Sequence, residues 1–199
     1  MDLIPLIREN PRICRYIDIP IQHITDNMLG LMKRSHNRKE TEAILTTLRD
    51  NIPGAVIRTT LIAGHPGESE EDFVELKNFI SEFRFDRLGV FAYSHEEDTF
   101  SYEQYEDNIP DDVKESRVGE LMEIQQNISA ELNESAVGNI FKVIIDRIEG
   151  EFFVGRTEFD SPEVDQEVLI PTDHNLEPGN FYNILITKST EFDLYGEPV

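Results

Sequence analysis

The sequence predicts an α/β protein in which a parallel sheet with helical crossovers precedes a small OB-like all-β barrel. Up to about residue 94, strand-like and helix-like segments alternate, as they do in βαβ units with right-handed crossovers. A long amphipathic segment follows at 111–135. From residue 139, short strand-like segments separated by glycine and proline succeed one another over about sixty residues, which is typical of an OB-like barrel.

Three strands are predicted in the first part of the chain, and each is rich in apolar residues. They are expected at 14–21, 55–64 and 87–94. Helices are expected at 37–51 and at about 70–83, because apolar residues recur there at helical spacing. Two helix starts carry capping residues: Thr25 or Asp26 before a short helix, and Ser69 with Asp72 at capping-box spacing.

The second part of the chain begins with an acidic segment. Residues 95–112 contain eight acidic residues and neither Lys nor Arg, so a loop is predicted there. The helix at 111–135 is expected to end before Gly138. We divide the chain into an α/β part at 1–110, a linker helix at 111–136 and a β domain at 137–199. Within the β domain, strands are predicted at 139–148, 152–159, 166–171, 181–189 and 192–196.

The chain is strongly acidic, with 18 Lys and Arg against 40 Asp and Glu and a formal net charge of −22. Residues 137–199 alone carry −9. Such a surface repels nucleic-acid phosphates at long range and attracts basic partners, so tRNA is an unfavourable partner. Charge speaks to association and solubility rather than to fold, and the alternative that the acidity only keeps the protein soluble stays open.

The composition also limits the compartment and the metal chemistry. No apolar run reaches the roughly 20 residues of a membrane span, and the N-terminus lacks a signal-peptide pattern. We interpret the chain as cytoplasmic, with no membrane partner. The single cysteine, Cys14, excludes an internal disulfide and a cysteine-rich metal site, so no metal ligands are predicted. Cys14 begins a predicted strand and is expected to be a buried small hydrophobic residue.

Polar side chains in the predicted strands mark a candidate binding face. Asp18 and Gln22 share one face of the first strand, and Arg58 and Thr60 share one face of the second, because side chains alternate. The glycine-rich turn at 64–68 allows backbone to approach a ligand and opens a helix whose N-terminus favours an anion. A structural alternative stays open, in which Asp18 and Arg58 form a buried ion pair and the turn only joins a strand to a helix.

The chain resembles the radical S-adenosylmethionine (SAM) methylthiotransferases over nearly its whole length. The motifs that carry this resemblance occur in the family's order: YIDIPIQH (16–23), LMKRSHNR (31–38), IRTTLIAGHPGESEEDF (57–73), DRLGVFAYS (86–94), ELMEIQQNIS and VGRTEFDSPEVDQEVLI (154–170). The fold implied is a partial radical-SAM TIM-like barrel followed by an OB-like TRAM domain. Within the family the chain is most similar to the RimO branch, which methylthiolates an aspartate of ribosomal protein S-twelve.

The resemblance implies a mechanism and a partner. A 4Fe-4S cluster reduces SAM to methionine and a 5′-deoxyadenosyl radical, which abstracts hydrogen from the target aspartate side chain before a methylthio group is installed. The acidic TRAM domain agrees with a basic ribosomal protein as substrate.

The resemblance also implies that nine residues lie in the SAM site. Those of the first strand would face the ribose or the amino-acid end of SAM, those of the second strand and its turn would line the pocket, and those of the third would lie near the adenine. In that order they are Asp18 and Gln22; Arg58, Ile62, Gly64 and Glu68; and Phe91, Tyr93 and Ser94. The last three have an alternative role as ordinary strand and core residues.

The chain departs from the family because it lacks the C-x₃-C-x₂-C motif that binds the cluster and the family's N-terminal domain. His65 stands where an aromatic residue such as Phe is expected. We therefore predict a C-terminal fragment that is inactive alone: SAM and 4Fe-4S clusters belong to the full-length enzyme, and none is expected bound to the fragment. A partial barrel exposes a strand edge, so self-association is also expected.

Two alternatives remain. A tRNA (adenosine) methylthiotransferase of the MiaB type shares the chemistry, and salt-sensitive binding of tRNA to residues 137–199 would favour it. A non-catalytic acidic module that binds basic proteins would require Met1 to be the native start of the chain.

Overall fold

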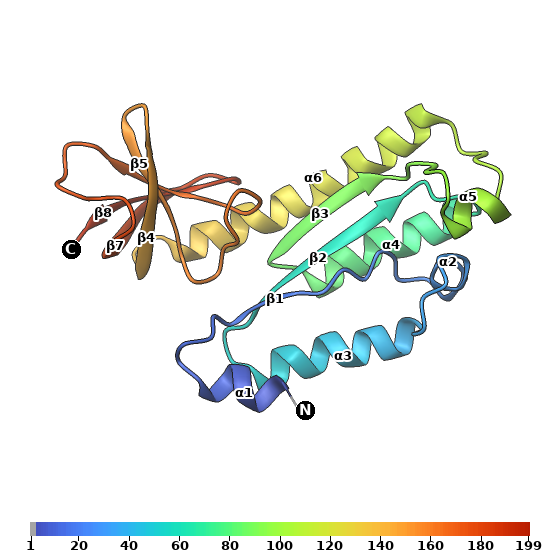
Figure 1. Cartoon of the computed structure of the whole chain (residues 1–199), viewed down its shortest axis with the longest axis horizontal. Helices are drawn as coiled ribbons and strands as arrows, with labels where there is room; N and C mark the ends of the chain where they lie inside the picture. Colours follow the sequence, from blue (N-terminus) through green and yellow to red (C-terminus); the bar gives the residue numbers. More distant parts are fainter. Residues whose placement is uncertain (1–2) are drawn as a thin grey trace. The chain divides into compact units, whose positions relative to one another are not determined.

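The computed structural model describes residues 3–199, and the chain divides into two compact units (Figure 1). The first unit holds residues 3–8 and Ile17–Gln125, and the second holds Glu9–Tyr16 and Gln126–Val199. Helix α6 (Asp111–Ala136) contributes residues to both units. None of the helices within residues 3–199 combines the length and the apolar character that crossing a membrane requires.

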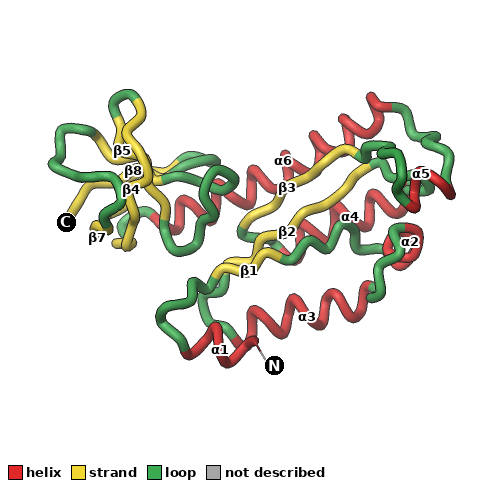
Figure 2. Tube along the Cα trace, in the orientation of Figure 1, coloured by secondary structure: helices red, strands yellow, loops and turns green. Residues whose placement is uncertain are grey.

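The first unit is built on a three-stranded sheet in the order β1-β2-β3 (Figure 2), and the register of β2 and β3 is parallel. The strands are β1 (Tyr16–Asp18), β2 (Val56–Ala63) and β3 (Arg87–Ala92). The helices are α1 (Leu3–Glu9), α2 (Asp26–Leu31), α3 (Arg38–Asn51), α4 (Glu70–Phe83) and α5 (Phe100–Gln104). This alternation of parallel strands and helices is the arrangement that the sequence predicts.

Burial along β2 alternates strictly, because successive side chains point to opposite faces of the sheet. Ile57, Leu61 and their neighbours on one face are fully buried, as are Leu45 of α3 and Phe73 of α4. The other face, which carries Arg58, Thr60 and Ile62, is only partly buried. The covered face is therefore the core of the unit, and the opposite face is available for binding.

The predicted helix starts are confirmed by their caps. The Thr25 hydroxyl accepts a hydrogen bond from the Met28 amide, which makes Thr25 the N-cap of α2. At α4 the capping box is complete, since the Ser69 hydroxyl accepts from the Asp72 amide at 3.1 Å and the Asp72 carboxylate accepts from the Ser69 amide at 3.1 Å.

Three expectations about this region are wrong. The strand expected at 14–21 shrinks to three residues, because Pro20 has no N–H to donate to the ladder. The segment expected to be a loop at 95–112 contains α5, whose N-cap Thr99 accepts from the Tyr102 amide. Cys14 is exposed rather than buried, because it precedes the shortened strand.

The second unit is a closed five-stranded barrel in the order β4-β5-β6-β8-β7, which confirms the OB-like β domain. Its strands are β4 (Ile140–Glu149), β5 (Phe152–Arg156), β6 (Val168–Pro171), β7 (Phe181–Ser189) and β8 (Leu194–Pro198). β6 and β8 pair in parallel, and the other pairs are antiparallel. Side chains such as Val143, Phe153 and Ile184 fill its interior.

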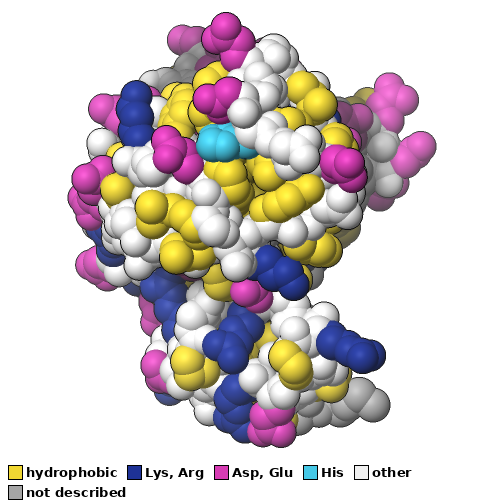
Figure 3. Space-filling view, turned by 90° about the vertical axis from the view of Figure 1, so that its left-hand side faces the viewer, with side chains coloured by type: hydrophobic (Ala, Val, Ile, Leu, Met, Phe, Trp, Pro, Cys, Tyr) yellow, Lys and Arg dark blue, Asp and Glu magenta, His cyan; other side chains and the backbone are white. Residues whose placement is uncertain are grey.

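The surface of the barrel unit mixes acidic and hydrophobic side chains (Figure 3). Among the exposed hydrophobic residues are Ile140, Ile148 and Phe181, each more than half exposed. Several acidic residues are already engaged by basic ones, as Arg147 is with both Glu149 and Glu167 at the surface. Surface pairs of this kind contribute little to stability. Because residues 137–199 carry a net charge of −9, carboxylates remain in excess in this unit.

Candidate functional site

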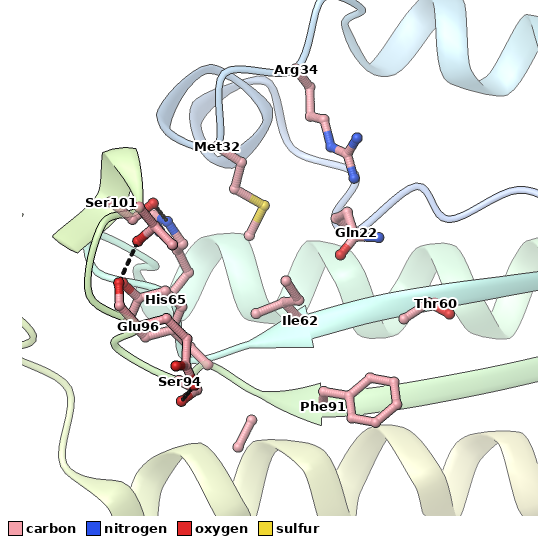
Figure 4. Close-up of a pocket in the computed structure, with 13 residues that line it drawn as sticks. Gln22, Met32, Arg34, Thr60, Ile62, His65, Phe91, Ser94, Glu96 and Ser101 are labelled. Atoms are coloured by element: carbon pink, nitrogen blue, oxygen red, sulfur yellow. Dashed lines mark hydrogen bonds between the residues drawn. The ribbon is translucent and has the colours of Figure 1, made fainter.

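A cavity of about 430 Å³ lies at the carboxyl end of β2 and β3 (Figure 4). In parallel sheets this end is where ligands bind, because successive loops converge there. The cavity is lined from the region of β1 and α2 by Gln22, Met32 and Arg34, from β2 and its turn by Thr60, Ile62 and His65, and from β3 and the segment after it by Phe91, Ala92, Tyr93, Ser94, Glu96, Thr99 and Ser101.

The part of the cavity wall that precedes β2 in the sequence depends on the unusual backbone conformation of Gln22. Gln22 has φ 67°, a left-handed conformation that costs a non-glycine residue about 1–2 kcal/mol. The backbone there is held against β2, since the Gln22 amide donates to the Thr60 carbonyl and the Gln22 carbonyl accepts from the Ile62 amide, both at 2.9 Å. The Gln22 side chain therefore lies above the open face of β2 (Figure 4).

Arg34, in the turn that follows α2, contributes a positively charged guanidinium to the cavity wall. Its amide donates to the Leu29 carbonyl at 2.8 Å, and the Lys33 amide donates to the Gly30 carbonyl at 3.1 Å with Lys33 in the left-handed conformation, which is the Schellman motif that ends α2. A guanidinium nitrogen donates to the Pro20 carbonyl at 3.4 Å and leaves the other donors of the group for a ligand. Arg34 and Met32 face Ile62 across the cavity (Figure 4).

Asp18 and Arg58 do not line the cavity but pair with each other. The Arg58 Nη1–Asp18 Oδ2 distance is 3.0 Å, and Arg58 Nη1 also donates to the Thr60 hydroxyl at 3.3 Å. The Asp18 side chain is 47% exposed, so this is a partly solvated pair rather than the buried pair of the structural alternative. The pair orders the open face of β2 next to Thr60.

Gly64 and Glu68 shape the turn between β2 and α4 without lining the cavity. Gly64 has φ 77° and Gly67 has φ 88°, conformations that favour glycine. The Glu68 carboxylate is fully buried, accepts a hydrogen bond from the Gly64 amide and pairs with Arg117 of α6 at 3.2 Å. Glu68 therefore links the end of the turn to its start at Gly64, and it links the turn to α6 through Arg117.

His65, in the middle of this turn, forms part of the cavity wall. Its Nδ1 lies 2.9 Å from the Pro66 carbonyl and its Nε2 lies 2.9 Å from the Ser101 hydroxyl. The Tyr93 ring packs edge-on against it at 4.8 Å between centroids. Because the Pro66 carbonyl can only accept, Nδ1 carries the proton and Nε2 accepts from Ser101.

Stability should depend on the charge state of His65. Burial lowers its pKa below the ordinary value, although the Pro66 hydrogen bond and the Glu68 charge act in the opposite direction. A lowered pKa means that the unfolded chain binds the proton first as the pH falls below about 6.5, so the native state loses stability there. Urea unfolding from pH 7.5 to 5.5 should show this loss in the natural chain and a smaller loss in His65→Phe. His174→Gln, on the barrel unit, is the matched control, and an unchanged pH slope in His65→Phe would contradict the expectation.

Five of the nine residues proposed from the resemblance meet at this cavity: Gln22, Ile62, Phe91, Tyr93 and Ser94. The other four, Asp18, Arg58, Gly64 and Glu68, lie beside it. Of the other wall residues, Thr60 belongs to the binding face that the sequence predicts, and His65 lies in the turn at 64–68. The rest were not assigned from the sequence, and among them only Arg34, in the motif LMKRSHNR, had a usable signal.

The described residues offer no site for a metal cluster. Within residues 3–199 no group of three or more His, Cys, Asp and Glu side chains is arranged to hold a metal ion. Cys14 is a free, exposed thiol and cannot replace three thiolates.

Comparisons with known proteins agree with the two units. Residues 2–80 match the Radical SAM superfamily, and residues 137–199 match the TRAM domain. A relative from Bacteroides thetaiotaomicron, named ribosomal protein uS12 methylthiotransferase RimO, is 54% identical over 98% of this chain and 45% of its own length. The protein of the same name from Flavobacterium johnsoniae is 55% identical over 100% of this chain and 45% of its own.

The chain therefore spans about 45% of the length of these relatives. Among solved structures, coproporphyrinogen III oxidase (HemN) from Escherichia coli, described as a radical SAM enzyme, aligns over 58% of this chain and 27% of its own. Its TM-score is 0.49 and its identity 21%.

Proposed function

Because the chain belongs to the radical SAM methylthiotransferases that carry a TRAM domain, we propose that it forms part of an enzyme that methylthiolates an aspartate of ribosomal protein uS12. The observation that carries the proposal is the cavity at the ends of β2 and β3, which joins a guanidinium, an amide and an apolar wall in one space. Its volume of about 430 Å³ suits a cofactor-sized ligand, since small-molecule sites span roughly 300–1,000 Å³.

SAM has groups that match this wall. Arg34 would pair with the carboxylate of its methionine part, as a guanidinium does with a planar anion. The Gln22 amide would hydrogen-bond the ribose hydroxyls. Ile62 and Phe91, side by side on adjacent strands, would pack against the adenine, which would cover the Phe91 ring that is now 60% exposed.

The 4Fe-4S cluster does not fit the residues of this chain that the structure describes, because they include a single exposed cysteine and no metal-binding group. In the proposed enzyme its ligands come from elsewhere in the polypeptide. When bound, SAM would supply the 5′-deoxyadenosyl group, and the electron for its cleavage would come from the cluster. The residues of this chain bind SAM, orient it and restrict water, and the 199 residues alone would be inactive.

The proposed substrate follows from charge. The TRAM residues 137–199 carry −9, which favours approach of a basic ribosomal protein and opposes approach of a phosphate backbone. The MiaB-type alternative requires that the same surface bind tRNA despite the repulsion between its carboxylates and the tRNA phosphates.

The proposal is tested with the complete enzyme encoded by the natural gene, reconstituted with iron and sulfide and incubated with SAM and reductant. Basic uS12 should gain a methylthio group on an aspartate, detected by peptide mass spectrometry, whereas tRNA should gain none. The 199-residue chain, treated in the same way, should release no 5′-deoxyadenosine.

The alternatives give different outcomes in the same experiment. Methylthiolated adenosine in tRNA, with uS12 unmodified, would establish the MiaB-type function instead. A natural gene that begins at Met1, with no SAM cleavage and salt-sensitive binding to basic proteins, would leave the acidic binding module.

A further inference from the structure

The Glu68 carboxylate organises the turn behind the cavity from a fully buried position. Its Oε2 accepts from the Gly64 amide and lies 3.2 Å from Arg117 Nη1, while its Oε1 faces His23 Nε2 at 3.6 Å. Both the Glu68 and the His23 side chains are 0% exposed. A carboxylate in such a place is tolerated only with a cationic partner and hydrogen-bond donors, because burial removes its hydration.

Arg117 of α6 supplies the guanidinium that pairs with this carboxylate. Its Nη1 also donates to the Glu68 carbonyl at 3.3 Å, and its Nη2 lies 3.3 Å from the Glu70 carboxylate. Its guanidinium carbon sits 5.1 Å from the centre of the Phe73 ring, and its side chain is 9% exposed. A planar guanidinium held on several sides in this way has one orientation, so it fixes the Glu68 side chain in turn.

The chain of contacts leads from α6 to the cavity. Arg117 fixes Glu68, Glu68 fixes the Gly64 amide, and the residue after Gly64 is His65, which lines the cavity and is hydrogen-bonded to Ser101 in the same wall. Displacing the Glu68 carboxylate would free the Gly64 amide and loosen the left-handed backbone of the turn. The His65 ring would then lose its fixed place in the wall.

We propose that Arg117 is a positioning residue for the SAM cavity, acting through Glu68 on the turn at 64–68. The inference rests on the proposed function, and it assigns to the linker helix a part in SAM binding. Arg117 does not line the cavity, so its effect is on the shape of the wall rather than on the ligand.

The test is Arg117→Met in the complete enzyme. The Kd for SAM, measured by equilibrium dialysis, should rise about tenfold, the equivalent of one charge-assisted hydrogen bond. The KM for uS12 should stay within twofold, because the barrel unit is untouched. In the isotope-labelled 199-residue chain, the Gly64 amide should exchange with solvent at least tenfold faster than in the unsubstituted chain.

Lys77→Met is the matched control. Lys77 of α4 pairs with Glu120 of α6 at 2.8 Å and lies over the same Phe73 ring at 4.7 Å. It therefore links the same two helices through the same ring but has no contact with Glu68. Its removal should leave the Kd for SAM and the exchange of the Gly64 amide unchanged.

Arg117→Lys keeps the result interpretable if Arg117→Met fails to fold. Lysine retains the charge but cannot hold Glu68 from several sides, so the Kd for SAM should rise about threefold with stability near that of the parent. An unchanged Kd in every folded variant, with the Gly64 amide still protected, would overturn the inference and leave the proposed function intact. If the unsubstituted complete enzyme failed to bind SAM, the proposed function would fail, and the exchange of the Gly64 amide would still decide whether Arg117 holds the turn.

Discussion

Gly64→Ala is expected to lower the free energy of unfolding of the first unit by about 3 kcal/mol. A methyl group at this position would lie 3.0 Å from Lys114 Cβ and 3.3 Å from Lys114 Cα. Lys114 has little room to withdraw, because its ammonium group pairs with Asp107 at 2.7 Å and with Asp111 at 3.1 Å. The left-handed backbone, at φ 77°, costs an alanine about a further 1 kcal/mol. Urea unfolding followed by far-ultraviolet circular dichroism measures the loss.

Gly54→Ala isolates the effect of crowding in this experiment. Gly54 has φ 73°, nearly the same backbone conformation, but a methyl group there would meet no atom within 4 Å. Its substitution should cost only about 1 kcal/mol. Equal losses in the two variants would mean that α6 does not press against the turn, and would count against the packing described for Lys114.

Gly155→Ala is expected to produce a loss of similar size, about 3 kcal/mol, in the barrel unit. Gly155 lies on β5, where a methyl group would sit 2.5 Å from the Ile144 carbonyl oxygen and 2.6 Å from Val143 Cγ1. On β4, Ile145 is the register partner of Gly155 and Ile144 is that of the next residue, Arg156, so relief requires the ladder between the two strands to open. Hydrogen exchange should show loss of protection in β4 and β5 before it appears in the first unit.

Gly150→Ala is the control within the same hairpin. Gly150 joins β4 to β5 with φ 58°, and the space around it is open. A loss of about 1 kcal/mol is expected from the backbone conformation alone. If Gly155→Ala lowered the free energy of unfolding by no more than this, the closeness of β4 and β5 would not restrict the size of the side chain at this position.

Most of the fold follows from local signals in the sequence. The boundaries of α4 were predictable because Ser69 and Asp72 cap its start and apolar residues repeat at helical spacing up to Phe83. The barrel strands were predictable because glycine and proline separate them. β1 was predicted too long and α5 was missed, since the length of β1 depends on pairing with β2 and the start of α5 on a single threonine cap in an acidic stretch.

The candidate site was less predictable than the fold, for a physical reason. Alternation along β2 identifies the face of Thr60 and Ile62, but it does not say how far along the strand the cavity extends. Arg58 lies on the same face, but its guanidinium pairs with Asp18 and does not line the cavity. The contributions of Arg34 and Ser101 come from segments after α2 and within α5, whose approach to β2 depends on tertiary packing.

The exposure of Cys14 has a practical consequence for work on this chain. As the sole cysteine of the 199 residues, it allows one maleimide-linked fluorophore or spin label to be attached at a known position without further engineering. The same thiol can oxidise to join two copies through an intermolecular disulfide. Any self-association caused by an open strand edge must therefore be measured with reductant, or with the thiol alkylated, so that the two kinds of dimer are told apart.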